Sequence, residues 1–218
     1  MKNQDMRYVP ALSYDWLTFF YDPVARLTTR EKTFKAALLQ QARIADDHRI
    51  LDLGCGTGTL TLAAKRKAPD CEVVGLDGDP AILKQAVAKA RRAGLQIAYD
   101  EGMSFALPYA GDSFDRVLSS LFFHHLTRES KLKTLAEAHR VLKRGGELHI
   151  ADWGTPDNLF MRFGSSLVKK FDGIVTTADS FNGLLPQFIA QMGFVFVEET
   201  SHFNTLFGTI RLLRARKP

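Results

Sequence analysis

The sequence predicts a doubly wound α/β fold: a mostly parallel, seven-stranded sheet with helices on both faces and a C-terminal antiparallel hairpin. Three observations support this prediction. Short apolar runs alternate with segments of helical periodicity, an order that produces parallel sheets. A glycine-rich turn at 54–58 joins the first run to a helical segment, as ligand-binding sheets of this kind require. The last two runs, 194–199 and 206–214, lie too close together for a crossover connection and predict a hairpin.

Helix caps and periodicity place the elements in order. Thr28 and Glu31 have the spacing of a capping box, which predicts a helix ahead of the first strand. Asp79 and Pro80 are residue types that open a helix, and Gly94 closes it. Strands are expected at 50–53, 72–77, 95–100, 114–119 and 147–152 before the hairpin, with a helix from about 127 to 143 ahead of the last of these.

The glycine-rich turn belongs to residues 49–58, which read RILDLGCGTG. Its glycines let the backbone turn sharply and approach a ligand without intervening side chains. A dinucleotide fingerprint would need a glycine at the position of Thr59, and no Gly-Lys-Ser/Thr follows, so the turn is neither that fingerprint nor a P-loop. The second strand ends in Asp77, 23 residues after Gly54, where a carboxylate would meet a ribose diol.

With L-D-L-G-C-G-T-G and V-V-G-L-D at this distance, the chain resembles the class I S-adenosylmethionine-dependent methyltransferases, most closely the ubiquinone/menaquinone C-methyltransferase and small-molecule methyltransferase branch. Residues 106–117 look like the stretch that leads into the family's fourth strand, and 119–126 like its sequel. Residues 137–146 resemble the helix end and glycine cap before the fifth strand. The resemblance runs from about Tyr14 to the C-terminus and implies S-adenosylmethionine as cofactor and S-adenosylhomocysteine as product.

The resemblance also implies a cofactor site beyond the carboxyl ends of the strands. The glycine loop would hold the methionine end of the cofactor, Asp77 the ribose hydroxyls, and Leu76 or Gly78 would flank the adenine. Asp52 either positions the cofactor's amino group through the loop or bonds loop amides. Cys55 fits as a small residue between two glycines, with a catalytic thiol as the alternative. The expected cofactor-binding residues are Asp52, Gly54, Cys55, Gly56, Gly58, Asp77, Gly78, Gly102, Met103, Ser104, Ser119, Tyr14 and Tyr21.

One position departs from the family pattern. Where the family has an acidic residue for the adenine amino group, Gly102 is followed here by Met103. A thioether is a weak hydrogen-bond acceptor, although it can pack on the purine face. Adenine recognition would then come from Ser104, from backbone groups, or from Asp100 or Glu101.

Methyl transfer from a sulfonium is an in-line displacement, and most of its acceleration can come from holding the nucleophile about 3–3.5 Å from the methyl group. A base is needed only when the acceptor arrives protonated. His124 and His125, with Asp152 as a further candidate, are the predicted catalytic residues. The alternative is structural: one histidine packs under the loop, the other bonds a backbone carbonyl, and Asp152 caps the next segment. His139 and His149 are expected to be structural.

Two variable regions would determine the acceptor. Residues 8–21 are rich in aromatics and, by resemblance, fold over the cofactor as a lid, with Tyr14 or Tyr21 near the sulfonium; a hydrophobic clasp on the sheet is the alternative. An apolar stripe from Leu159 to Phe171 would roof an apolar acceptor, rest on a membrane surface, or face the core.

We expect one domain, 1–218. It is made of an N-terminal helical lid (1–47), a cofactor-binding core (48–152), a variable substrate-side segment (153–193) and the closing hairpin (194–218).

Composition narrows the function classes. The net charge of +5 is spread over several helix faces, which argues against nucleic acid as a partner. No apolar run reaches the about 20 residues of a membrane span, and the polar start is unlike a signal peptide, so a cytoplasmic location is expected. The two cysteines have neither disulfide-scaffold nor metal-site spacing. A small-molecule acceptor is the expected partner, with peripheral membrane contact as an alternative, in a monomer or homodimer.

The prediction is therefore a methyltransferase acting on a small, apolar or aromatic acceptor. A quinone- or lipid-type methyltransferase at the membrane surface is one alternative. A nicotinamide-dependent oxidoreductase is a second, which Thr59 disfavours. A cofactor-binding protein without methyl-transfer activity is a third, which Met103 favours.

Overall fold

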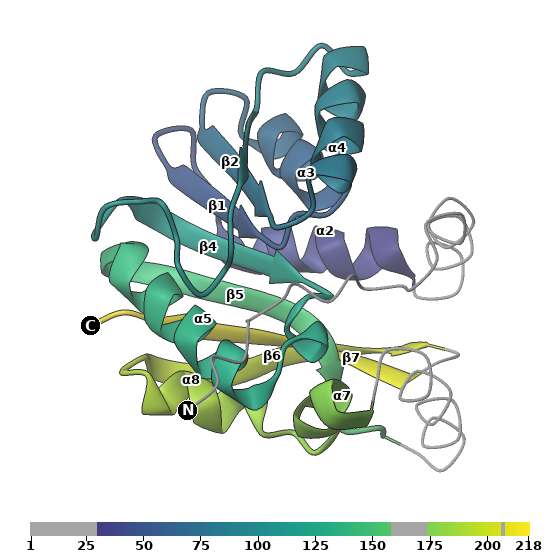
Figure 1. The fold of residues 1–218 in the computed structure, drawn as a ribbon, viewed down its shortest axis with the longest axis vertical. Helices are drawn as coiled ribbons and strands as arrows, with labels where there is room; N and C mark the ends of the chain where they lie inside the picture. The colour runs from purple at the N-terminus through teal and green to yellow at the C-terminus, as the bar shows by residue number, and fades with distance from the viewer. Residues whose placement is uncertain (1–29, 158–173, 206–207) are drawn as a thin grey trace, which may run out of the picture.

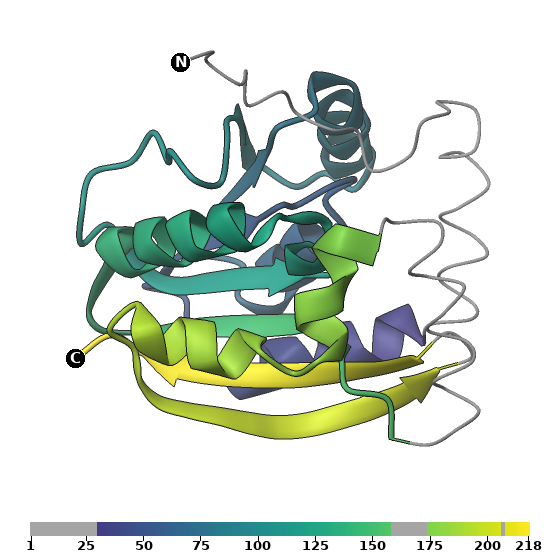
Figure 2. The ribbon, with the colours of Figure 1, turned by 60° about the horizontal axis from the view of Figure 1, so that its bottom comes forward.

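The computed structural model describes residues 30–157, 174–205 and 208–218. One seven-stranded sheet runs through them in the order β3-β2-β1-β4-β5-β7-β6 (Figure 1). The first five strands are parallel, and β7 runs antiparallel to both β5 and β6 (Figure 2). The predicted fold class is confirmed. The strands are β1 (Arg49–Leu53), β2 (Glu72–Asp77), β3 (Ala98–Glu101), β4 (Phe114–Ser120), β5 (Leu142–Gly154), β6 (Val195–Thr205) and β7 (Gly208–Arg216).

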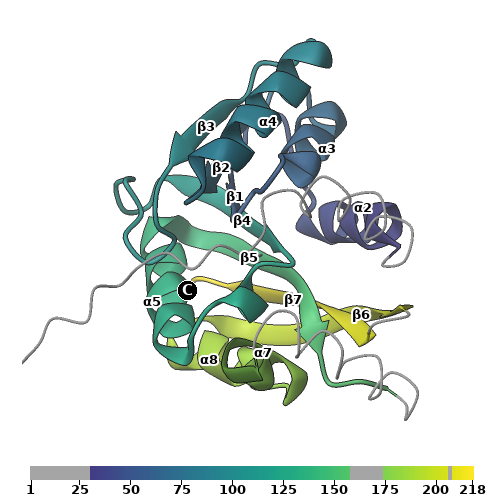
Figure 3. The ribbon, with the colours of Figure 1, turned by 45° about the vertical axis from the view of Figure 1, so that its right-hand side comes forward.

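Helices cover the sheet on both faces, as Figure 3 shows. Helices α2, α3 and α4 lie on one side, and α5, α7 and α8 lie on the other (Figure 3). A short 3-10 helix, η1, follows β4. The helices are α2 (Glu31–Ala42), α3 (Thr59–Lys67), α4 (Pro80–Arg92), η1 (Phe123–His125), α5 (Arg128–Val141), α7 (Ile174–Phe181) and α8 (Leu185–Gln191).

The central strands are apolar because both of their faces are buried. In β1, Ile50 packs in the cluster that includes α2 and α3, whereas Leu51 and Leu53 pack in the cluster that includes α5 and α8. All three side chains are fully buried. A continuous apolar run is what a central parallel strand needs, since side chains alternate between its two covered faces.

The sequence predicted side-chain caps at the starts of two helices, α2 and α4. In α4, the Asp79 carboxylate accepts hydrogen bonds from the amides of Ala81 (2.8 Å) and Ile82 (3.3 Å), so the predicted cap is confirmed. Helix α2 begins at Glu31, after an N-cap residue, Arg30, in the left-handed conformation and without a side-chain cap. Thr28, the predicted cap, lies outside the described residues.

The start of β5 differs from the sequence prediction. The sequence predicted a helix to about 143 with a glycine cap, but α5 ends at Val141 and the strand begins at Leu142. The glycine-cap prediction is wrong because Gly145 and Gly146 pair with the C-terminus. The Gly145 amide donates to the Lys217 carbonyl (2.9 Å), and the Lys217 amide donates to the Gly146 carbonyl (2.9 Å). Strand β3 is also shorter than predicted, and β6 runs on to Thr205.

The part of the predicted variable segment that the structure describes contains two helices that the sequence analysis did not assign. Leu185, Phe188 and Ile189 of α8 belong to the core cluster that α5 shares. Helix α7 is held by Lys131, a fully buried lysine whose ammonium donates to the carbonyls of Leu126 (2.7 Å) and Thr176 (2.6 Å). Within the described ranges, no helix has the length and apolarity that crossing a membrane requires.

The packing of α2 on the sheet generates a stability prediction. Leu38 is fully buried, whereas Lys32 on the same helix is exposed. Leu38→Ala should lower the free energy of unfolding by about 2–5 kcal/mol through lost burial and a residual cavity. Lys32→Ala should change it by less than about 0.5 kcal/mol. Urea unfolding followed by circular dichroism measures both, and equal effects of the two variants would contradict the docking of α2.

Candidate functional site

The glycine loop lies where β1 and β2, neighbouring parallel strands, both end. Its first two amides, of Gly54 and Cys55, donate to the Leu76 carbonyl at 2.9 and 3.0 Å. The Gly56 amide donates to Oδ2 of Asp77 at 2.8 Å. The loop after β1 is therefore fastened to the last two residues of β2.

The loop requires glycine for two separate reasons. Gly54 and Gly58 have φ angles of 70° and 72°, in the left-handed region that favours glycine. Neighbouring side chains also occupy the space that a Cβ atom would take. A Cβ on Gly54 would stand 2.3 Å from the Phe122 ring, and one on Gly58 would stand 2.5 Å from the Tyr99 hydroxyl. Aromatic side chains from β3 and from the segment after β4 thus approach the loop closely.

Asp77 is half-buried at the end of β2. Besides the Gly56 amide, its carboxylate accepts the Asp79 amide at 3.1 Å through Oδ1. Burial raises the pKa of Asp77, and the backbone amides of Gly56, Asp79 and Gly78 oppose that rise. A carboxylate has about four acceptor sites, so these hydrogen bonds leave acceptor capacity for ligand hydroxyls.

Asp52 lies beneath the loop and is almost fully buried. Within the described residues, its carboxylate accepts a hydrogen bond from the Thr61 hydroxyl of α3 at 2.5 Å. The sequence analysis predicted that Asp52 bonds loop amides or positions the cofactor's amino group, and it did not predict the hydrogen bond from Thr61. Burial raises the pKa of Asp52 from 3.8 to about 6, against the lowering effect of the Thr61 hydrogen bond.

Cys55 is buried, and burial raises the pKa of its thiol. A Cβ atom on Gly75 of β2 would stand 3.0 Å from its sulfur. The thiol is therefore neutral and packed on the sheet, as expected of a small residue between two glycines. A reactive cysteine needs an environment that lowers its pKa.

The residues after β3 form the next part of this edge. The Gly102 amide donates to the Asp77 carbonyl at 3.0 Å, and the Ala106 amide donates to the Met103 carbonyl at 3.0 Å. Ser104 is buried and its hydroxyl bonds Thr134 of α5 at 2.8 Å, so it points into the protein. Gly78 and Met103 are half-buried, and Glu101 is exposed at the end of β3. Asp100, another predicted candidate for adenine recognition, accepts a hydrogen bond from the Tyr109 hydroxyl at 2.8 Å.

The predicted catalytic residues lie together where β4 and β5 end: His124 and His125 follow β4, and Asp152 stands near the end of β5. His124 is buried, and its Nδ1 lies 2.6 Å from Oδ1 of Asp152, whose Oδ2 accepts the His124 amide at 3.2 Å. The same carboxylate accepts the Trp153 amide at 2.7 Å. The ring of His125 lies 3.9 Å from that of His124, and burial together with His124 lowers the pKa of His125 to about 3.

Other predicted residues have mainly structural contacts or are not described. Ser119 is fully buried and donates to the Leu53 carbonyl at 2.9 Å. His149 is buried with Nδ1 3.2 Å from Gln41, and His139 packs edge-on against Phe194. Tyr14, Tyr21 and the stripe from Leu159 to Phe171 lie outside the described residues.

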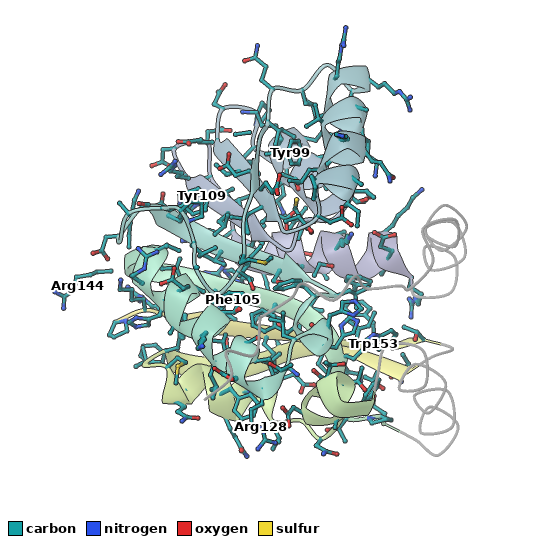
Figure 4. All side chains as sticks on the ribbon, viewed as in Figure 1. Tyr99, Phe105, Tyr109, Arg128, Arg144 and Trp153 are labelled. Atoms are coloured by element: carbon teal, nitrogen blue, oxygen red, sulfur yellow. The ribbon has the colours of Figure 1, made fainter. Side chains whose placement is uncertain are left out.

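The sequence analysis did not single out three side chains that surround the loop. Phe122 and Tyr99 contact its glycines, and Lys89 of α4 donates to the hydroxyls of Thr57 (2.8 Å) and Thr59 (3.3 Å). Figure 4 shows Tyr99 in the upper part of the molecule, whereas Trp153 lies at the lower right beside α7. Strand alternation could have placed Tyr99 on the face of α3 and α4, but its reach across β2 depends on Gly75.

Comparisons with known proteins agree with this geometry. Residues 50–146 match the family model of a methyltransferase domain. The chain is 36% identical over 143 residues to the demethylmenaquinone methyltransferase of Thermus thermophilus, covering 66% of this chain and 62% of that protein. It is 28% identical over 207 residues to an uncharacterized methyltransferase of Synechocystis, covering 93% of this chain and 92% of that protein.

The fold is similar to that of a putative methyltransferase from Bacillus halodurans, with a TM-score of 0.69 and 24% identity over 84% of this chain and 98% of that one. The matched segments span 62% and 52% of the demethylmenaquinone methyltransferases of T. thermophilus and Deinococcus radiodurans. The chain thus spans less than two thirds of the length of these two relatives.

The burial of Asp52 generates a pH prediction. Its folded-state pKa of about 6 lies above the 3.8 of an exposed group. Its contribution to stability is therefore fully present below pH 3.8 and is lost as the pH rises through about 6. Each pKa unit corresponds to about 1.4 kcal/mol, so the loss is about 3 kcal/mol.

Asp52→Asn removes this titration. The stability of the wild type relative to that variant should fall by about 3 kcal/mol between pH 4 and pH 7. Asp70→Asn, at an exposed position, should show no such trend. Urea unfolding of the ligand-free proteins across this pH range measures the difference in stability between the wild type and each variant, and a difference between wild type and Asp52→Asn that does not change with pH would contradict the burial argument.

Proposed function

We propose that this chain, which belongs to the class I S-adenosylmethionine-dependent methyltransferases, transfers a methyl group from S-adenosylmethionine to a small-molecule acceptor. The observation that carries the proposal is the fastening of the glycine loop to Asp77. It brings the open backbone of Gly56 and a half-buried carboxylate together at the ends of two adjacent parallel strands. Ligands of doubly wound sheets bind at such an edge.

The residues at this edge suit the parts of that cofactor. The loop around Gly56, where a Cβ atom would meet nothing within 4 Å, would take the methionine end, and Asp77 would accept the ribose hydroxyls with the acceptor capacity that its backbone hydrogen bonds leave. Met103 and Gly78, both half-buried, would pack beside the adenine. Ser104 and Asp100 have hydrogen-bond partners inside the protein, so we assign recognition of the adenine amino group to backbone carbonyls of 102–103 or to Glu101, which is exposed at the end of β3.

Bound S-adenosylmethionine supplies an electrophilic methyl group, so the protein's main task is to position the acceptor in line with it. We infer that His124 and Asp152 hold the segment after β4, because both are buried and bonded to each other. His125 is the more accessible of the two histidines. With a pKa of about 3 it is neutral at pH 7 and a weak base, so it would orient an acceptor rather than deprotonate it.

The acceptor is proposed to be a small aromatic molecule of the quinol type. Support comes from relatives named demethylmenaquinone methyltransferase, at 36% and 33% identity over parts of their length. A quinol can ionise at its own ring hydroxyl and so provide the nucleophile with little help from a base. The test is a turnover assay with a reduced demethylmenaquinone analogue of short side chain, an aromatic phenol and an aliphatic amine, followed by mass spectrometry. Methylation of the quinol supports the acceptor class, and methylation of the amine alone would replace it.

Asp77 generates a binding prediction. A hydrogen bond to a charged group contributes about 1.5–3 kcal/mol, so Asp77→Asn should weaken the binding of S-adenosylhomocysteine about 10- to 100-fold. Glu72→Gln, at the exposed start of the same strand, should leave affinity unchanged. Isothermal titration calorimetry measures the dissociation constants, and urea unfolding checks that both variants remain folded. Unchanged affinity in folded Asp77→Asn would remove Asp77 from the site.

A further inference from the structure

The segment after β4 contains a strained residue next to the glycine loop. Leu121 has a φ of 54°, in the left-handed region that bulky non-glycine side chains avoid. Its amide donates to the Ala151 carbonyl of β5 at 2.8 Å, which holds the backbone in this conformation. Such strain persists only when the surroundings impose it, and it concentrates at functional sites.

The consequence of this turn is the position of Phe122. Its ring carbons lie 2.3 Å from the point where a Cβ atom of Gly54 would be, so the ring rests directly on the first glycine of the loop. The ring also meets that of Phe123 edge-on, with centroids 5.7 Å apart. No larger residue than glycine could stand at position 54 while Phe122 keeps this place.

The neighbours of Phe122 fix it from both sides. Phe123 is fully buried, and His124 is anchored by its amide and ring to Asp152. The His125 amide donates to the Phe122 carbonyl at 3.1 Å. Phe122 itself is only half-buried. The segment therefore presents one aromatic side chain at the glycine loop while its neighbours are committed to the interior.

We propose that Phe122 is a ligand-binding side chain of the cofactor site, which recognises the positive charge of the sulfonium through its aromatic ring and thereby favours S-adenosylmethionine over its neutral product. This inference rests on the proposed function. An aromatic face attracts cations, including those of ligands, and makes only the weaker sulfur–aromatic contact with a neutral sulfide. Transfer of the methyl group removes the charge, so the same contact would weaken when product forms.

Carboxylates near the loop also favour a cation, and they remain in a Phe122 variant. The ratio of the dissociation constants for S-adenosylhomocysteine and S-adenosylmethionine, compared between variant and wild type, therefore isolates the contribution of the Phe122 ring. Phe122→Leu keeps an apolar side chain but removes the aromatic face, whereas Phe122→Tyr keeps that face. Phe203→Leu is a matched control, since Phe203 is a partly buried aromatic packed against the opposite core cluster.

Isothermal titration calorimetry of the whole chain with S-adenosylmethionine and with S-adenosylhomocysteine tests the proposal. Phe122→Leu should weaken binding of the first about 3- to 30-fold and of the second less than about 2-fold. Phe122→Tyr and Phe203→Leu should keep the wild-type ratio. An unfolded fraction of a variant lowers the fitted number of binding sites, which distinguishes it from an equal loss of both affinities.

Two results would overturn the proposal, and they are distinguishable from failure of the proposed function. If the wild type binds both ligands and Phe122→Leu weakens both equally, the ring contributes only packing. If Phe122→Leu weakens neither, the ring does not face the ligand. If the wild type binds neither ligand, the proposed function itself fails and this inference fails with it.

Discussion

The contact on which the site depends is the hydrogen bond from the Gly56 amide to the Asp77 carboxylate. It joins the loop after β1 to the end of β2, and the amides of Gly54 and Cys55 reinforce it through the Leu76 carbonyl. Only adjacent parallel strands that end together can be joined in this way. The strand order, the glycine spacing and the position of Asp77 therefore form one constraint.

Two carboxylates close to one loop make this edge costly for the ligand-free protein. Burial raises the pKa of both Asp52 and Asp77, which means that their charged forms are poorly solvated there. The Thr61 hydroxyl and backbone amides offset part of that cost. A positively charged ligand would offset more of it, which fits a sulfonium cofactor better than an anionic one.

The sequence was most informative where one short segment determines both structure and ligand contact. The buried strand, its glycine turn and Asp77 are local patterns, and the fold class they predict is confirmed. The sequence was less informative where a side chain's partner is remote in the chain. Ser104 forms a hydrogen bond with Thr134, and His124 forms one with Asp152. Both pairs depend on packing between remote segments, which no spacing rule in the sequence predicts. The pairing of Gly145 and Gly146 with Lys217 could not be read from a local glycine signal for the same reason.

The loop after β1 and the end of β2 are together proposed to bind S-adenosylmethionine. A calorimetric titration of the wild-type chain with S-adenosylmethionine, S-adenosylhomocysteine and NAD tests this proposal most directly, because the glycine spacing separates the two classes of cofactor. We expect saturable binding of both sulfur ligands at one site and much weaker binding of NAD. Tighter binding of NAD than of either sulfur ligand would contradict it.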